Sequence, residues 1–252
     1  MSSTSKGEGR TLPKRFYKEA RAERVSDGSG ATAYRILLDG RPVRTPAKAE
    51  LQLPAQALAE AVAEEWAAQA AHIDPSRMPL TRIANSTIDG VVARRAEVEA
   101  EIVRYAMNDL IYYRAEQPET LVRLQAQAWD PPLRWAEQSF ATTLQTGQGI
   151  AHVEQPAALA EAVAQTLRGL PPLVLSALHV ITTLTGSAVL ALACARSRLA
   201  PDAVWAAAHV DEDFQISQWG WDAEAEARRK AREGDFMAAA RILDLMRSVQ
   251  HS

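Results

Sequence analysis

The densest group of polar side chains in this 252-residue chain lies between His209 and Gly220, in the string HVDEDFQISQWG. On a helix, His209 and Asp213 are four residues apart and share a face, so both side chains could ligate one metal ion. The sequence identifies no third ligand beside them. The pair supports one alternative hypothesis for function, a metal-dependent hydrolase that uses His209, Asp213 and a remote ligand.

The three consecutive carboxylates Asp211, Glu212 and Asp213 allow further interpretations. They are poorly placed as a general acid and base, because adjacent residues on a helix point in different directions. They could instead form a solvated acidic turn on an amphipathic helix. The buried face of that helix would then consist of Val204, Trp205, Ala208, Phe214 and Trp219. Charged groups beside large aromatic side chains also suit a protein-binding surface, where aromatic residues supply buried area and charges select the partner.

The sequence lacks the short motifs of common catalytic and cofactor sites. It contains no G-x-G-x-x-G, no P-loop, no G-x-S-x-G and no H-E-x-x-H. The single cysteine, Cys194, can form neither an internal disulfide nor a multi-thiolate metal site, and its apolar surroundings predict a buried, inert thiol. We therefore expect no cofactor and no catalytic residue.

Composition and charge limit the class of protein. Hydrophobic residues make up 47% of the chain and charged residues 23%, which is ordinary globular usage and excludes a wholly disordered or collagen-like protein. A net charge of -3 gives no general attraction to nucleic acid or anionic lipid. Residues 169–195 carry no charged side chain, a length that could span a bilayer. Because Thr185, Gly186 and Ser187 resemble a helix C-cap followed by an N-cap, we predict two short buried helices and no membrane insertion.

The first part of the chain has the pattern of strands. Strand-like segments occur at residues 14–25, 31–38, 41–44 and 49–53. Asp39-Gly40 is a strong hairpin signal, because both central positions of a type I′ turn need positive φ. We predict a disordered lead over residues 1–13 and a β-rich domain over residues 14–54, which the helical segment 55–77 can extend.

From Pro54 onward, apolar residues recur with the 3.6-residue period of helices. The predicted helices cover residues 55–71, 79–91, 93–106, 119–129, a segment starting at 131, 156–169, the pair within 169–195, 201–219, and 223–249 with a break near 234. We therefore predict an α+β protein, with a small antiparallel β-rich N-terminal domain followed by a larger all-helical orthogonal bundle over residues 78–252.

Seven strings, occurring in order, resemble one known family. They are RFYK (15–18), LDGRPVRTP (38–46), EEW (64–66), MPLTRIANSTIDG (78–90), DLIYYRA (109–115), WDPPLRWA (129–136) and DEDFQISQWG (211–220). The resemblance covers about residues 15–229. It is to the assembly chaperones of the F-type ATP synthase that bind its alpha subunit, a family of mitochondria and alpha-proteobacteria.

The resemblance implies a chaperone without enzymatic activity. Such a protein binds the unassembled alpha subunit of the soluble ATP synthase head, prevents its aggregation and delivers it for assembly. We expect it to act as a monomer, with no nucleic-acid or membrane partner. The string WDAEAEARR after Gly220 resembles bacterial members, which indicates a bacterial cytoplasm; in a eukaryote the location would be the mitochondrial matrix.

The resemblance also suggests partner-binding residues. An acidic residue important in the family precedes its Q-I-x-x-W-G pattern, and this position falls within residues 211–213, with Glu212 favoured and expected to be exposed. Gln215 and Trp219 match the pattern and are expected to orient the helix. In the hairpin string, Arg41 and Arg44 are either solvent-exposed parts of a tight turn or partner contacts.

Overall fold

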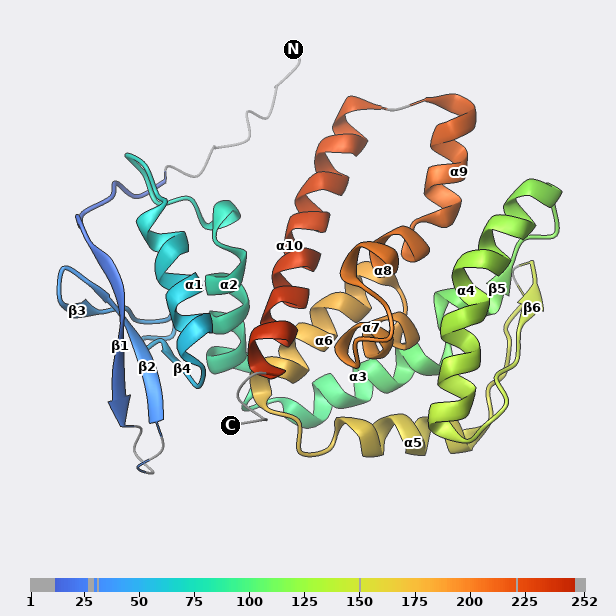
Figure 1. Cartoon of the computed structure of the whole chain (residues 1–252), viewed down its shortest axis with the longest axis horizontal. Coiled ribbons are helices and arrows are strands. Elements are labelled where there is room, and N and C mark those ends of the chain that lie inside the picture. Colours follow the sequence, from blue (N-terminus) through green and yellow to red (C-terminus); the bar gives the residue numbers. More distant parts are fainter. Residues whose placement is uncertain (1–11, 27–29, 31, 150, 221, 248–252) are drawn as a thin grey trace, which may run out of the picture. The chain divides into compact units, whose positions relative to one another are not determined.

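The computed structural model describes residues 12–26, 30, 32–149, 151–220 and 222–247. The protein is α+β, as predicted, and the chain divides into two compact units: unit 1 (residues 1–82) and unit 2 (residues 83–252). Strands and a covering helix make up unit 1, and helices dominate unit 2 (Figure 1). Of the predicted disordered lead, residues 1–11 lie outside the described residues, as do residues 27–29 of the predicted first turn.

Unit 1 contains a four-stranded antiparallel sheet with β2 at its centre. Its strands are β1 (Ala20–Ser26), β2 (Thr32–Leu38), β3 (Arg41–Pro42) and β4 (Gln52–Leu53). One side of β2 pairs with β1 and the other side with β3 and β4, so β1 is an edge strand. Asp39 and Gly40 form the predicted tight turn, with φ of 47° and 80°.

The first strand begins later than predicted. Residues 14–19 run beside the end of helix α1 (Gln56–Ala67) instead of pairing in the sheet. Lys14 forms an isolated bridge with His72, and the Tyr17 hydroxyl donates to the Trp66 carbonyl oxygen at 2.7 Å. These bonds to the end of α1 and the residues after it hold the segment in place, so it needs no pairing with a strand.

Helix α1 ends at Ala67, four residues before its predicted end, because the Gln69 side chain turns the chain. Its amide nitrogen donates to the Glu65 carbonyl oxygen (2.9 Å), and its amide oxygen accepts from the Asp74 N–H (2.8 Å). The short helix η1 (Pro75–Arg77) follows, and then α2 (Pro79–Ser86). The core of unit 1 includes the fully buried side chains of Ile36, Leu51, Leu53, Leu58 and Val62.

Unit 2 is built around two buried helices. Its elements are the π-helical turn η2 (Thr87–Val91), α3 (Arg95–Met107), η3 (Leu110–Tyr112), α4 (Glu119–Phe140), α5 (Ala157–Leu167), α6 (Pro172–Thr185), α7 (Ala188–Ala195), α8 (Pro201–Ala208), α9 (Val210–Trp219) and α10 (Ala223–Arg247). Two short strands, β5 (Tyr113–Arg114) and β6 (Gly147–Gln148), pair in parallel. Helices α6 and α7 lie in the middle of this unit (Figure 1).

The uncharged segment folds as the predicted buried helix pair. Gly186, with φ of 68°, ends α6, and the Ser187 hydroxyl caps α7 by accepting from the Leu190 N–H at 3.0 Å. Burial of Cys194 in α7 raises the pKa of its thiol to about 11. Within the described residues, neither of these helices nor any other is long and apolar enough to cross a bilayer.

Within the described part of unit 2, three helix boundaries differ from the prediction. Helix α4 continues through Pro131 and Pro132 instead of ending before them, because Trp129, Leu133, Ala136 and Phe140 bury one continuous face. Helix α10 likewise continues through Gly234. Burial of its second half, including Phe236 and Ile242, outweighs the cost of about 1 kcal/mol for a helical glycine.

The third difference is a break at His209, where one helix was predicted over residues 201–219. The His209 ring donates from Nδ1 to the Trp205 carbonyl oxygen at 2.8 Å. In a continuous helix, this oxygen would accept from the His209 backbone N–H. The side chain takes that place, and the backbone N–H bonds to Ala206 instead, which ends α8.

Asp109 ties η3 to the beginning of α7. Its fully buried carboxylate accepts from the Val189 N–H (2.9 Å) and from the Ile111 N–H (3.3 Å). Burial raises the pKa of this carboxyl group from 3.8 to about 7. The folded state therefore holds the proton more tightly than the unfolded state does. The stability that this proton contributes is present below pH 3.8 and is lost as the pH rises through about 7.

We predict that Asp109→Asn lowers the free energy of unfolding by about 1–3 kcal/mol, because the amide keeps one acceptor and places an NH2 group against a backbone donor. The variant also loses the Asp109 part of the pH dependence. Urea unfolding at about pH 5 and about pH 8 measures both effects. Asp244→Asn, at a carboxylate whose side chain is 72% exposed, is the matched control. An equal pH dependence in wild type and Asp109→Asn would contradict this role of Asp109.

Candidate functional site

Helix α9 carries the predicted acidic residues in its first turn. Negative side chains are favoured there, because the free N–H groups at a helix N-terminus carry partial positive charge. None of the ten residues of α9 is fully buried. The helix therefore owes its place to side-chain bonds with its neighbours as well as to packing.

The three carboxylates point to different partners, as their spacing predicts. Asp211 accepts from the Gln125 side-chain amide at 2.7 Å, and the oxygen of the same amide accepts from the Ala115 N–H at 2.8 Å. Because Gln125 is itself buried, this chain of bonds fixes α9 to α4. Asp211 therefore has a structural role.

Glu212 and Asp213 both face Arg229 on α10. The Arg229 guanidinium lies 2.5 Å from an Asp213 oxygen and 3.7 Å from a Glu212 oxygen, and its side chain is only 12% exposed. The Glu212 side chain is 41% exposed, so it is half-buried and not freely exposed as predicted. The reason is that α10 folds back against the first turn of α9 through this arginine.

His209 does not join Asp213 in a metal site. The ring is buried beside Trp205, with ring centroids 3.9 Å apart, and its Nδ1 is used by the Trp205 carbonyl oxygen. Burial lowers the pKa of His209, which favours the neutral ring. Asp213 is paired with Arg229. Across the described ranges, no group of three or more His, Cys, Asp or Glu residues could hold a metal ion, so the hydrolase hypothesis lacks its remote ligand there.

The outer side of α9 is exposed. Gln215 is exposed and Trp219 has 88% of its surface accessible, although an amphipathic helix was expected to bury Trp219. Gly220, with φ of 84°, ends the helix directly after it. Among the described residues, no hydrogen bond involves the side chain of Gln215 or Trp219. Neither side chain is needed to hold the helix in place.

The opposite side of α9 forms one wall of an apolar hollow of about 550 Å³ between α4, α8 and α9. Its lining includes Leu124, Pro131, Pro132, Ala203, Ala206 and Phe214. Asp213 and Ser217 add polar groups from α9. Leu124 is 40% exposed, so the hollow is open to solvent.

The two prolines of α4 change the chemistry of this hollow. Proline has no N–H, so Pro131 and Pro132 cannot donate to the carbonyl groups four residues earlier, on Gln127 and Ala128. All four residues line the hollow. Its wall therefore combines apolar side chains with backbone acceptors that lack their usual helical donor. Sequence reasoning missed this feature, although the Pro-Pro pair inside a helical pattern was the available signal.

Arg41 and Arg44 lie in unit 1, on β3 and in the loop after it. The Arg44 guanidinium donates to the Lys48 carbonyl oxygen at 2.8 Å and so closes that loop. Arg41 is exposed. Contact of either residue with a partner stays a prediction.

Most of the seven strings have a structural explanation. A key side chain in five of them bonds to backbone groups or caps an element; these are Tyr17, Asp39, Glu65, Asp109 and Trp129. In a sixth string, the Thr81 hydroxyl donates to the Glu65 carboxylate at 2.7 Å. The string on α9 differs, because Gln215 and Trp219 face solvent. Structural roles therefore explain the residues of six strings. They do not explain the exposed residues on the outer side of α9.

Comparisons with known proteins agree on one family. Residues 14–137 match the family model described as ATP12 chaperone protein. The Atu1473 protein of Agrobacterium tumefaciens is 43% identical with a TM-score of 0.87, over 93% of this chain and 87% of that chain. Atp12 from Paracoccus denitrificans is 39% identical with a TM-score of 0.84, over 92% of this chain and 98% of that chain. A mutant of the Paracoccus protein has a TM-score of 0.83 at 39% identity.

We predict that Arg229→Gln lowers the free energy of unfolding by about 1 kcal/mol, because it leaves the carboxylates of Glu212 and Asp213 without their shared cation. The cost stays small because both carboxylates are partly solvated. Arg228→Gln is the matched control, since Arg228 forms an exposed ion pair with Glu224 and should change stability by less than about 0.5 kcal/mol. Chemical denaturation of both variants measures the difference, and equal values would contradict the role given to Arg229.

Proposed function

Because this chain belongs to the ATP12 chaperone family, we propose that it binds the unassembled alpha subunit of the F-type ATP synthase, prevents its aggregation and delivers it for assembly. A subunit destined for a ring exposes large apolar interfaces before its neighbours arrive, and it aggregates when alone. Binding the folded, unassembled form stabilises it by mass action and competes with self-association. The protein makes or breaks no covalent bond in this role.

Trp219 is the main support for a protein partner at α9. A tryptophan with 88% of its surface exposed is unfavourable in water unless another surface covers it. Tryptophan is also the residue type most enriched among those that dominate binding energy at protein interfaces. Trp219 is the last residue of α9, so it can contact a partner without any change in the core of unit 2.

The hollow between α4, α8 and α9 extends this surface. Its apolar lining suits side chains that the client would later bury against another subunit. The carbonyl groups of Gln127 and Ala128 can accept hydrogen bonds from backbone or side-chain N–H groups of the client. We propose that an apolar client segment with such donors occupies the hollow.

Among the three carboxylates, we propose that Glu212 reaches the client. Asp211 is held by Gln125, and Asp213 forms the shorter contact with Arg229. Glu212 is more loosely held, at 3.7 Å from Arg229 and 3.9 Å from the His209 ring. A basic client group can replace such distant partners at little cost. Gln215, exposed on the same helix, would add a polar contact.

The remaining properties follow from the same proposal. We infer that the protein acts as a monomer, without cofactor or nucleic acid, in a bacterial cytoplasm; the similar proteins of Agrobacterium tumefaciens and Paracoccus denitrificans support the bacterial setting. Arg41, exposed on β3, is a candidate for a further contact. Arg44 is a weaker one because it already binds the Lys48 carbonyl group.

Trp219→Ala should weaken capture of the purified alpha subunit at least about tenfold, because it removes an exposed aromatic anchor. Its far-UV circular dichroism and urea midpoint should not change. Val92→Ala is the matched control, since Val92 is an apolar residue of unit 2 that is 57% exposed and lies outside the seven strings. Isothermal titration and light scattering of the alpha subunit measure capture and aggregation. If Trp219→Ala captures the alpha subunit as well as the wild type does, the client does not bind at Trp219.

Glu212→Lys should abolish capture by reversing charge at the contact, and it should also lower the free energy of unfolding by about 1 kcal/mol, because it puts a second cation beside Arg229. Glu224→Lys, at an 80% exposed side chain on α10, makes the same charge change and should leave capture intact. If both variants capture equally well, the charge at position 212 does not select the client.

A further inference from the structure

Within the described residues, the outer edge of β1 presents backbone groups in a regular row that no other strand pairs with. The Asp39 N–H donates to the Glu19 carbonyl oxygen at 3.1 Å, so residues 19 and 39 form a hydrogen-bonded pair at the start of the β1–β2 ladder. Hydrogen-bonded and non-hydrogen-bonded pairs alternate along an antiparallel ladder. Arg21, Glu23 and Val25 therefore bond to β2. The intervening residues, Ala20, Ala22 and Arg24, direct their N–H and C=O groups away from β2.

The far side of β2 confirms this alternation. Ile36 is opposite Ala22, and its carbonyl oxygen accepts from the Val43 N–H at 2.8 Å, on the side away from β1. The Ala22 backbone groups must then point to the free edge. Within the described part of unit 1, no backbone hydrogen bond outside the ladder involves Ala20, Ala22 or Arg24. Six backbone groups thus remain for another strand.

Neither a bulge nor a proline protects this edge. The strand keeps seven consecutive residue pairs with β2, so it has no bulge, and it contains no proline. Of the usual protections of an exposed edge, β1 has only charged side chains, at Arg21, Glu23 and Arg24, and these leave its backbone groups open to a strand of matching charge. A free edge of this length matches the spacing of an extended polypeptide and of no other backbone conformation.

A shallow hollow of about 400 Å³ lies beside the edge, between β1 and α1. Ala20, Ala22, Ala63 and Ala67 line it, and these small side chains leave room for those of an added strand. Arg21, Glu60 and Glu64 also line it, so the wall holds two carboxylates and one guanidinium. The exposed Glu60 carboxylate accepts from the Gln56 side-chain amide at 2.8 Å, a neutral donor that leaves its negative charge in place. This charge favours an occupant that carries lysine or arginine.

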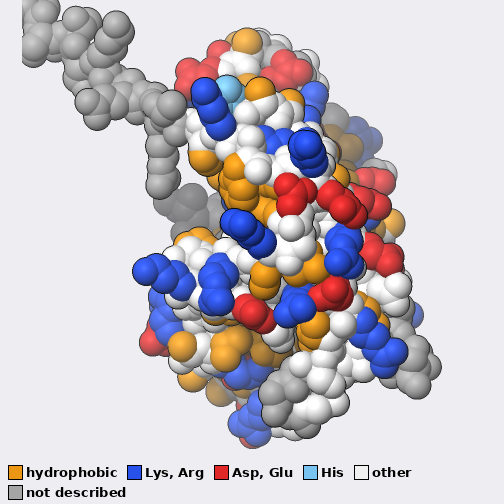
Figure 2. Space-filling view, turned by 90° about the vertical axis from the view of Figure 1, so that its left-hand side faces the viewer, with side chains coloured by type: hydrophobic (Ala, Val, Ile, Leu, Met, Phe, Trp, Pro, Cys, Tyr) orange, Lys and Arg blue, Asp and Glu red, His pale blue; other side chains and the backbone are white. Residues whose placement is uncertain are grey.

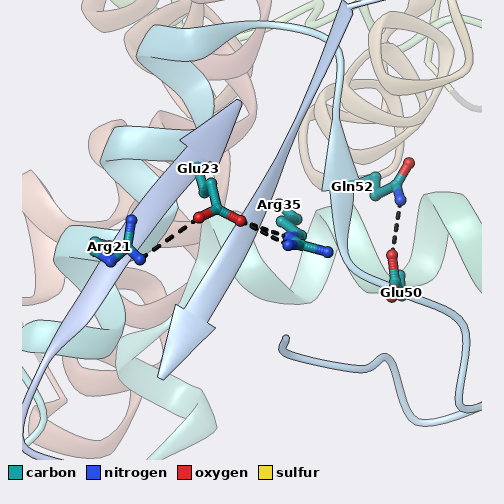
Figure 3. A network of polar contacts seen from close by, with 5 residues as sticks. All are labelled: Arg21, Glu23, Arg35, Glu50 and Gln52. Atoms are coloured by element: carbon teal, nitrogen blue, oxygen red, sulfur yellow. Dashed lines mark hydrogen bonds and ion pairs between the residues drawn. The ribbon is translucent and has the colours of Figure 1, made fainter. Parts of the chain in front are cut away.

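The charges on the other face of the sheet are already balanced. Glu23 lies between Arg21, at 3.5 Å, and Arg35, at 2.7 Å, and Gln52 donates to Glu50 at 2.8 Å (Figure 3). On the side of the molecule that carries β1 and β3, basic and acidic side chains alternate with apolar atoms (Figure 2). The Glu60 carboxylate on α1, which among the described residues accepts only from the neutral Gln56 amide, is therefore the group that selects the charge of an added strand.

We propose that the free edge of β1 takes an extended segment of the client polypeptide as a fifth strand, with small side chains over the alanines and a basic side chain toward Glu60. The inference rests on the proposed function, because it needs a protein client. The β1 edge is a second binding site, which selects an extended backbone and a basic side chain. The hollow between α4, α8 and α9 selects apolar side chains.

Ala22→Pro tests the edge directly. Proline removes the N–H that points to the free edge, and the ladder with β2 does not use this group, so the sheet should remain folded. Capture of the purified alpha subunit should weaken about tenfold. Ala57→Pro is the matched control, because Ala57 is exposed in the first turn of α1, where its N–H has no helical acceptor and proline is tolerated; it should capture the client like the wild type. Circular dichroism and the urea midpoint check that both variants fold.

Amide hydrogen exchange of the wild-type protein gives a measurement that does not depend on any variant. The amides of Ala20, Ala22 and Arg24 should exchange rapidly in the free protein and become protected when the alpha subunit is added. Those of Arg21 and Glu23 should be protected in both states, which provides an internal control.

Three results would overturn the inference. If the client binds and leaves the edge amides unprotected, the edge is not its docking site, although the proposed function stands. If the alpha subunit does not bind at all, both proposals fail. If protection increases with the protein's own concentration in the absence of client, the occupant is a second copy of this chain.

Discussion

Carboxylates that accept backbone N–H groups hold this fold together. Glu65 binds the first N–H groups of α2, and Asp109 binds the N–H of Val189 in α7. Asp39 does the same for the segment that enters β1. A charged acceptor makes a stronger hydrogen bond than a neutral one, so each of these acids fixes the position of two elements at once. On α9, Asp211 has a similar structural role through Gln125, whereas Glu212 accepts from no backbone N–H among the described residues.

Much of the fold could be predicted because its signals are local. Asp39-Gly40 specified a turn, and Thr185-Gly186-Ser187 divided the apolar segment into two helices. The boundaries that differ depend on distant contacts. The continuation of α4 through its prolines requires the face that Trp129 buries, and the break after α8 requires the bond from the His209 ring to Trp205. A periodicity pattern contains neither contact.

The site was predictable in type and only partly in detail. The string on α9 indicated a surface with acids beside aromatic residues, and the structure places these residues on one helix. Their individual roles depend on Gln125 and Arg229, which are 86 and 16–17 residues away in sequence, so adjacent carboxylates could not be told apart. The exposure of Trp219 was missed for a similar reason: only tertiary packing decides which side of a helix meets the core.

The partly solvated carboxylates that contact Arg229 bear on how fast a complex with the client would dissociate. Ion pairs this accessible to water contribute little net energy, and water or another charged group can replace either partner quickly. A binding surface that combines such pairs with one large aromatic side chain is expected to bind the client weakly. Because affinity differences are expressed mainly in dissociation rates, the complex should then dissociate quickly. In the proposed function, the task ends when the client joins a ring, and fast exchange is then an advantage, because a competitor that covers more of the client's surface can displace the protein.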